Sequence, residues 1–296
     1  APKALLRGGS SRLLEELYRY RSRPGDVLRS LRWVEIPTGI ENDLLQRFEA
    51  RKEVLSGYIS CCSEGPIQDT IERFQDALAI NPKDYEATYL LAKLLYRIGE
   101  SFKDAGRPNE AAKAYEKGIE AIDHFIGGDR ALLSLHFDLE MIYAKAHLDL
   151  GTMSLKANRL KEAAEALQRS VSGEVRYAEA HNNLGIVYER MGKYDAAVNQ
   201  YQRAIDLNPD LVSARMNIAN THLKQEKYRE AIQNYRWVQD LRPDLAITNY
   251  NLGIAYFKQN QWEEAEKEWK RALELDPDFS EAKSSLVIVQ NKLRSD

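Results

Sequence analysis

Apolar residues recur along most of the chain at the three- and four-residue spacing of amphipathic helices, and this pattern itself repeats every 34 residues. Four blocks align without gaps, at residues 144–177, 178–211, 212–245 and 246–279, and a partial fifth block begins at Ser280. Each block contains two helical stretches, and the apolar spacing is interrupted between them near the fifteenth position. The pattern therefore predicts two helices in every block, which we name helix A and helix B.

Several positions in the blocks keep one kind of residue, and each has a physical reason. Small residues at positions 8 and 20 let helices A and B approach closely, while large residues at positions 7 and 24 fill the space between neighbouring pairs. Proline at position 32 ends helix B, because it lacks the N–H that the helix requires. Position 8 is Gly151, Gly185, Ala219 and Gly253; position 20 is Ala163, Ala197, Ala231 and Ala265; position 24 is Leu167, Tyr201, Tyr235 and Trp269; position 32 is Pro in the last three blocks; the turn is predicted at Gly192, Glu226 and Asn260.

A single helix pair cannot bury its apolar face, so the pairs are expected to stack. The pattern resembles the tetratricopeptide repeat (TPR) family, most fully in residues 178–211 and 246–279. This resemblance implies an all-α solenoid, in which antiparallel helix pairs form a right-handed superhelix. Residues 280–296 are predicted to form a C-terminal capping helix with a polar outer face. That face would consist of Glu281, Lys283, Ser284, Asn291 and Lys292.

Residues 51–143 match the repeat pattern only loosely. A degenerate repeat is predicted at 51–84, and the turn expected near Gly99 is delayed into 105–118, which predicts extended helices. The GGD sequence at 127–129 then interrupts the chain. No breaker occurs from Arg130 to Ala157, so one continuous helix is predicted to start about four turns before the first regular repeat. We expect divergent helical repeats at 51–143 and regular ones at 144–279.

The first 50 residues are predicted to form a basic helical arm. Residues 1–34 carry eight Lys or Arg and three Asp or Glu, a net charge of +5 in a chain whose total is −3. One interpretation is a solvated arm that docks on the acidic remainder of the chain. The other is an association with a membrane or with nucleic acid through this arm, although the overall charge argues against attraction of the whole protein to nucleic acid.

The sequence leaves the cellular compartment open. No apolar run is long enough to cross a membrane, and the two cysteines, Cys61 and Cys62, are adjacent and compatible with either redox compartment. Because the chain starts at Ala1, we expect a processed or truncated N-terminus. The default expectation is a cytoplasmic protein, and an extracytoplasmic or membrane-associated location is the alternative.

Residues with catalytic potential do not form a recognisable motif. The five histidines lack metal-ligand spacing, and no phosphate-binding loop or nucleophile elbow is present. His147 and His181 occupy position 4 of successive blocks, where we expect them to pack between helices. The sequence thus predicts a protein that is not an enzyme and binds no cofactor or metal.

The best candidate for function is a stripe on helix A, at positions 2, 6, 9 and 13, which the resemblance places on the concave surface of the superhelix. Position 6 is asparagine in three successive blocks, and an asparagine amide both donates and accepts hydrogen bonds, as a peptide backbone requires. Position 13 is basic in every block, and apolar residues at positions 5 and 9, among them Leu148 and Ile288, complete the groove. The predicted partner-binding residues are Asn182, Asn183, Ile186, Arg190, Met216, Asn217, Asn220, Lys224, Tyr250, Asn251, Ile254 and Lys258.

These residues favour a scaffold or adaptor that holds a peptide segment or helix in its concave groove, and the basic positions favour a ligand with acidic flanks. Asparagine is also frequent at position 6 in the family, so a purely structural role of the row stays open. The family's carboxylate clamp for chaperone tails is not expected, because Asn182, Ile247 and Asn251 stand where its cations would be. The alternative is a structural component of a homo-oligomer or larger assembly, with Trp237 either exposed as an interface residue or packed on the neighbouring helix.

Overall fold

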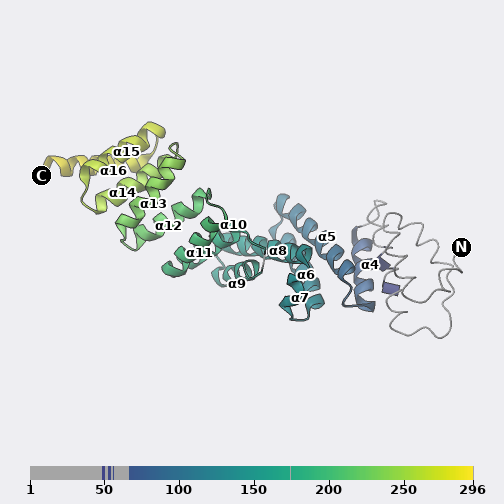
Figure 1. Ribbon diagram of the computed structural model, residues 1–296. Helices are drawn as coiled ribbons and strands as arrows, with labels where there is room; N and C mark the ends of the chain where they lie inside the picture. The colour runs from purple at the N-terminus through teal and green to yellow at the C-terminus, as the bar shows by residue number, and fades with distance from the viewer. Residues whose placement is uncertain (1–48, 51–52, 55, 57–66, 174, 296) are drawn as a thin grey trace, which may run out of the picture. The chain divides into compact units, whose positions relative to one another are not determined.

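The computed structural model describes residues 49–50, 53–54, 56, 67–173 and 175–295, which form helices and the turns that connect them, with no strand among them. The chain divides into two compact units, residues 1–146 and 147–296, whose boundary lies inside one long helix (Figure 1). Most of the predicted basic arm, as well as Cys61 and Cys62, lies outside the described residues. The arm therefore stays a prediction.

The first unit is built from long helices, as the delayed turn predicts. Its elements are α4 (Ile67–Ile80), α5 (Tyr85–Asp104), α6 (Pro108–Ile126), α7 (Arg130–Ser134) and the start of α8 (Phe137–Lys156). Helices α5 and α6 have 20 and 19 residues and pack against each other as a hairpin. The Asp84 side chain caps α5 by accepting a hydrogen bond from the backbone N–H of Ala87, and Pro108 lies in the first turn of α6, where a missing N–H costs nothing.

The prediction of one continuous helix from Arg130 to Ala157 is wrong. Helix α7 ends at Ser134 and α8 begins at Phe137, only about two turns before the first regular repeat. Between the two helices, the His136 ring stacks on Tyr85 with 4.4 Å between ring centroids and lies 5.5 Å from the ring of Phe125. Packing of His136 against α5 and α6 thus interrupts a segment whose local sequence contains no breaker.

The second unit consists of helix pairs in the order that the 34-residue period predicts. It comprises the remainder of α8, α9 (Leu160–Ser170), α10 (Ala178–Arg190), α11 (Tyr194–Leu207), α12 (Val212–Lys224), α13 (Tyr228–Leu241), α14 (Ala246–Lys258), α15 (Trp262–Leu275) and α16 (Ser280–Ser295). From α9 to α16, each helix packs on the next one along the chain, and α8 shares a hydrophobic core with α9 and α10. The repeats therefore stack in sequence order, as Figure 1 shows.

The turn between helices A and B has the same backbone conformation in all four repeats. The residue at position 15 is left-handed in each, with φ values of 57°, 75°, 60° and 60° at Asn158, Gly192, Glu226 and Asn260. A left-handed residue after a helix lets backbone N–H groups bond to the last carbonyl oxygens. After α10, for example, the N–H of Lys193 bonds to the carbonyl oxygen of Tyr188 at 2.8 Å.

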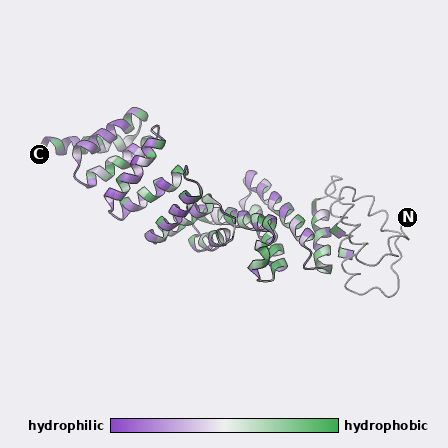
Figure 2. Cartoon of the chain, in the orientation of Figure 1, coloured by the Kyte–Doolittle hydropathy of each residue, from purple (hydrophilic) through white to green (hydrophobic). Residues whose placement is uncertain are grey.

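The core follows the small and large positions of the repeat. The alanines at position 20 are fully buried, and Tyr201, Tyr235 and Trp269 at position 24 are at most 3% exposed. A Cβ atom on Gly185 would lie 2.5 Å from the Tyr201 ring, so glycine is required for this close approach. Figure 2 shows that hydrophobic and hydrophilic residues alternate along each helix, as expected when one face is buried.

Helix α16 closes the second unit. It packs on the preceding helices through the buried residues Ala282 and Val289, and the five residues predicted to form its polar outer face are all exposed. Two large apolar residues, Val287 and Ile288, are also exposed on this helix, at 58% and 53%. The exposed surface of the capping helix is therefore partly apolar, whereas the sequence predicts a polar outer face.

Candidate functional site

The helices that carry the predicted binding stripe lie next to one another in the second unit. Helix α10 contacts α12, and α12 contacts α14, whereas no comparable contact joins the B helices α11, α13 and α15 to one another among the described residues. The A helices of successive repeats therefore lie side by side. We name the surface formed by the predicted partner-binding residues of α10, α12 and α14 the helix A face.

The three asparagines at position 6 connect successive repeats. The Nδ2 atom of Asn183 donates to Thr152 Oγ1 at 3.0 Å, that of Asn217 donates to Asn182 Oδ1 at 3.0 Å, and that of Asn251 donates to Asn220 Oδ1 at 3.3 Å. All three asparagines are partly exposed, and their Oδ1 atoms accept no hydrogen bond from the described residues. Each amide therefore joins two repeats and retains an acceptor.

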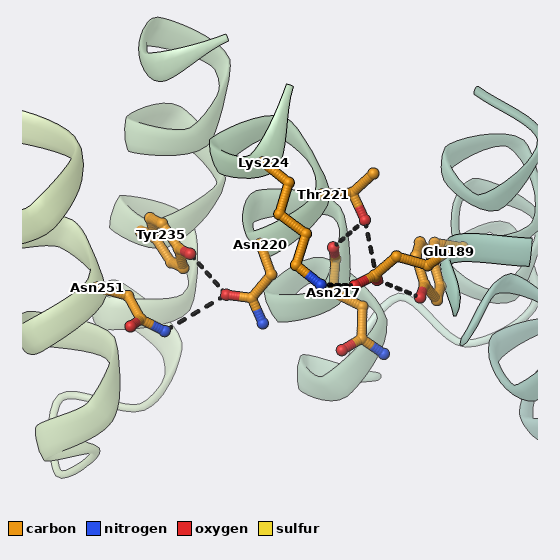
Figure 3. Close-up of polar contacts among 8 residues, drawn as sticks. Glu189, Asn217, Asn220, Thr221, Lys224, Tyr235 and Asn251 are labelled. Carbon is orange, nitrogen blue, oxygen red and sulfur yellow. Dashed lines mark hydrogen bonds and ion pairs between the residues drawn. The ribbon is translucent and has the colours of Figure 1, made fainter. Parts of the chain in front are cut away.

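Two of the residues that accept these hydrogen bonds, Asn182 and Asn220, are themselves fixed by burial or by a second hydrogen bond. Asn182 is only 8% exposed, so it contributes to the junction between α10 and α12 more than to the surface. Asn220 is partly exposed, and its Oδ1 atom also accepts a hydrogen bond of 2.6 Å from the hydroxyl of Tyr235, a residue of the helix B beside it (Figure 3). Tyr235 is fully buried, and burial raises the pKa of its hydroxyl group above the ordinary value.

Glu189 is a central polar residue that the sequence analysis did not single out. Its Oε2 atom accepts hydrogen bonds from the hydroxyls of Tyr201 at 2.9 Å and Thr221 at 3.1 Å, and its Oε1 atom lies 2.5 Å from Lys224 Nζ (Figure 3). Its side chain is 13% exposed. The sequence does contain a signal for Glu189. Position 12 is apolar in the other blocks, at Leu155, Leu223 and Phe257, and is a carboxylate only in this one.

The basic residues of the helix A face are not equivalent. The predicted binding cation Lys224 is neutralised by Glu189, and Arg190 reaches the carbonyl oxygen of Leu155 at 3.4 Å. Lys258 is exposed and forms no ion pair with the described residues. A continuous row of unpaired cations is therefore not present among the described residues, because Lys224 is paired while Arg190 and Lys258 are not.

The apolar residues of the face are also unequally exposed. Leu148, expected to line the groove, is 9% exposed and belongs to the core between α8, α9 and α10. Ile186, Met216, Tyr250 and Ile254 are partly buried and pack against the cores beneath them. These four side chains are therefore divided between the core and the exposed face.

Trp237 lies outside this face, on α13. It is partly buried, and the guanidinium group of Arg215 on α12 lies 3.8 Å from the centre of its ring. This is a close cation–π contact within one helix pair. The structure therefore places Trp237 against the neighbouring helix, and its role in an interface between molecules stays a prediction.

The histidines occupy helix-packing positions. His147 and His181 are buried, and His181 Nδ1 lies 2.8 Å from Gln200 Oε1 on the adjacent helix. Burial lowers the pKa of His222, which favours its neutral form. Among the described residues, no three His, Cys, Asp or Glu side chains come together as they would to hold a metal ion.

The described helices also include none with the length and hydropathy needed to span a membrane.

Comparisons with known proteins agree with this architecture. Sequence patterns of the tetratricopeptide repeat family match residues 178–211 and 246–279, residues 92–123 and residues 219–260. A comparison with curated proteins finds no match. Among solved structures, the chain is similar to YrrB, a TPR protein with an unusual peptide-binding site, with a TM-score of 0.55 and 20% identity over 73% of this chain and 98% of YrrB. It is also similar to the MamA protein, with a TM-score of 0.52 and 22% identity over 63% of this chain and 92% of MamA. The matched repeats and the shared fold show that the chain belongs to the tetratricopeptide repeat family.

Proposed function

We propose that the protein is a non-enzymatic scaffold that binds a peptide segment of a partner protein on the helix A face. One observation carries this proposal. Three hydrogen bonds between repeats, from Asn183, Asn217 and Asn251, align the A helices and leave a row of amide oxygens on a partly exposed surface. YrrB, which shares the fold, is a TPR protein with a peptide-binding site, and this supports the choice of ligand.

The chemistry of the row suits a peptide backbone. A free amide oxygen accepts a hydrogen bond from a backbone N–H, and every non-proline residue of a peptide carries such a donor. Repeating acceptors on successive A helices would therefore hold an extended segment regardless of most of its side chains. Their prior hydrogen bonds to the neighbouring repeat hold the amides in place, which reduces the entropy lost on binding.

The test begins with a phage-displayed random peptide library selected on the full chain, followed by affinity measurements with the selected peptides. We expect Asn217→Ala to weaken binding about tenfold, since it removes an acceptor and loosens the α10–α12 junction. Asn199→Ala is the matched control, because Asn199 is exposed on helix B of the neighbouring repeat.

A second variant separates binding from stability. Ser213 is exposed at position 2 of α12, beside the row, so Ser213→Trp would cover the face without disturbing the core. We expect Ser213→Trp to abolish binding at an unchanged melting temperature. If peptides bind equally well to the wild type, Asn217→Ala and Ser213→Trp, the helix A face is not the binding surface.

A further inference from the structure

The last junction between A helices differs from the three before it. Polar side chains connect α8 to α10, α10 to α12 and α12 to α14. At the equivalent positions of the last junction, α14 has Tyr250 and Ile254, and α16 has Ser285. No side-chain hydrogen bond joins Ser285 to α14 in the part of the chain that is described. The row of amides therefore gives way to an apolar surface at this end.

This apolar surface includes two of the more exposed aliphatic side chains of the second unit. Ile247 at the start of α14 is 46% exposed, and Ile288 on α16 is 53% exposed. Tyr250 and Ile254 lie on the same side of α14 as Ile247, three and seven residues later, and the Tyr250 ring lies 4.8 Å from that of Phe279. Ile288 holds the position on α16 that Ile254 holds on α14, 34 residues earlier. We name Ile247, Tyr250, Ile254 and Ile288 the apolar patch. Its exposed isoleucines would gain free energy from contact with a ligand.

The charge beside the apolar patch is positive. Lys258 lies one helical turn after Ile254, and Lys292 holds the equivalent position on α16. Helix α14 has no acidic residue at all, whereas the carboxylate of Glu189 on α10 pairs with Lys224 at the preceding repeat. Lys258 has no such partner among the described residues. A carboxylate of a ligand would therefore complement this end of the face.

We propose that the apolar patch determines ligand specificity: it binds one or two large apolar side chains of a peptide whose neighbouring Asp or Glu pairs with Lys258. This proposal rests on the proposed function, since it concerns the same surface, and it names the class of segment that the surface selects. The amide row would hold the backbone of the segment without distinguishing its sequence, while the apolar patch and Lys258 would select an apolar residue with an acidic neighbour. Buried apolar anchors typically contribute most of the binding energy at such surfaces.

The test uses the peptides selected on the full chain and compares two neighbouring residues of α16. Ile288→Ser removes an exposed side chain from the apolar patch, while Val287→Ser removes one of similar size and exposure that points about 100° away around the helix. We expect a loss of affinity of at least tenfold for Ile288→Ser and less than twofold for Val287→Ser. Because both residues are exposed, neither substitution should lower the melting temperature.

A charge exchange tests the acidic neighbour. We expect Lys258→Glu to weaken binding of the selected peptides about tenfold, and the same peptides with their Asp or Glu changed to Lys to recover affinity for Lys258→Glu. Two results would contradict the specificity proposal: equal peptide affinity of Ile288→Ser and Val287→Ser, or no recovery of affinity on charge exchange. If Ser213→Trp still abolishes binding in that case, the proposed function stands. If Ser213→Trp also binds normally, both are wrong.

Discussion

At the residue scale, the close approach of helices A and B depends on glycine at position 8. A Cβ atom on Gly185 would lie 2.5 Å from Tyr201 Cε1, and Tyr201 is fully buried, so its ring has little room to move. We expect Gly185→Ala to lower the free energy of unfolding by about 1–3 kcal/mol, as overpacking of a core does. Urea denaturation followed by circular dichroism measures this, with Asn199→Ala on the surface as control. A change below about 0.5 kcal/mol would show that the ring relocates easily.

Glu226 illustrates the opposite case, a residue that does not suit its backbone conformation. Its φ of 60° is left-handed, where the Cβ of an ordinary L-residue approaches the backbone, while Gly192 holds the same position one repeat earlier. We expect Glu226→Gly to raise the free energy of unfolding by about 1 kcal/mol, because glycine relieves this contact at a helix C-terminus. The same denaturation experiment measures it, and a loss of stability would contradict this explanation of the turn.

At the element scale, Glu189 joins three helices. It lies on α10 and binds Tyr201 on α11 and both Thr221 and Lys224 on α12. We expect Glu189→Ala to lower the free energy of unfolding by about 2 kcal/mol, because the Tyr201 hydroxyl would lose a charged hydrogen-bond acceptor. In the double variant with Lys224→Ala, the two effects should be less than additive, since both residues belong to one network. Strict additivity in denaturation measurements would mean that the ion pair contributes nothing.

The elements also show how far the sequence predicts the structure. The period of 34 was sufficient to predict the helix pairs of the regular repeats, because the small and large residues that pack against each other recur at fixed positions in each repeat. It did not predict the break before α8, because that break depends on His136 meeting Tyr85 and Phe125, which lie far away in the sequence. Likewise, the sequence placed asparagines on the helix A face but not their hydrogen bonds between repeats, nor the pairing of Lys224 with Glu189.

At the scale of the whole molecule, the repeats of the second unit bring short stretches of several helices onto one surface. None of these stretches would bind a segment of appreciable length alone, but side by side they offer amide acceptors along α10, α12 and α14 and an apolar end at Ile247 and Ile288. This arrangement is the one that the proposed binding of a peptide segment requires. In the proposed mode of binding, the amides contact the backbone of a ligand and the apolar patch contacts its side chains.

The most direct test of this central claim is to map where a bound peptide lies. A selected peptide carrying a photoreactive diazirine residue would be cross-linked to the full chain, and the attachment sites identified by mass spectrometry. We predict that the cross-links fall on α10, α12, α14 and α16, and that Ser213→Trp eliminates them. Cross-links concentrated on the B helices α11, α13 and α15, or unaffected by Ser213→Trp, would contradict the claim that the helix A face is the binding surface.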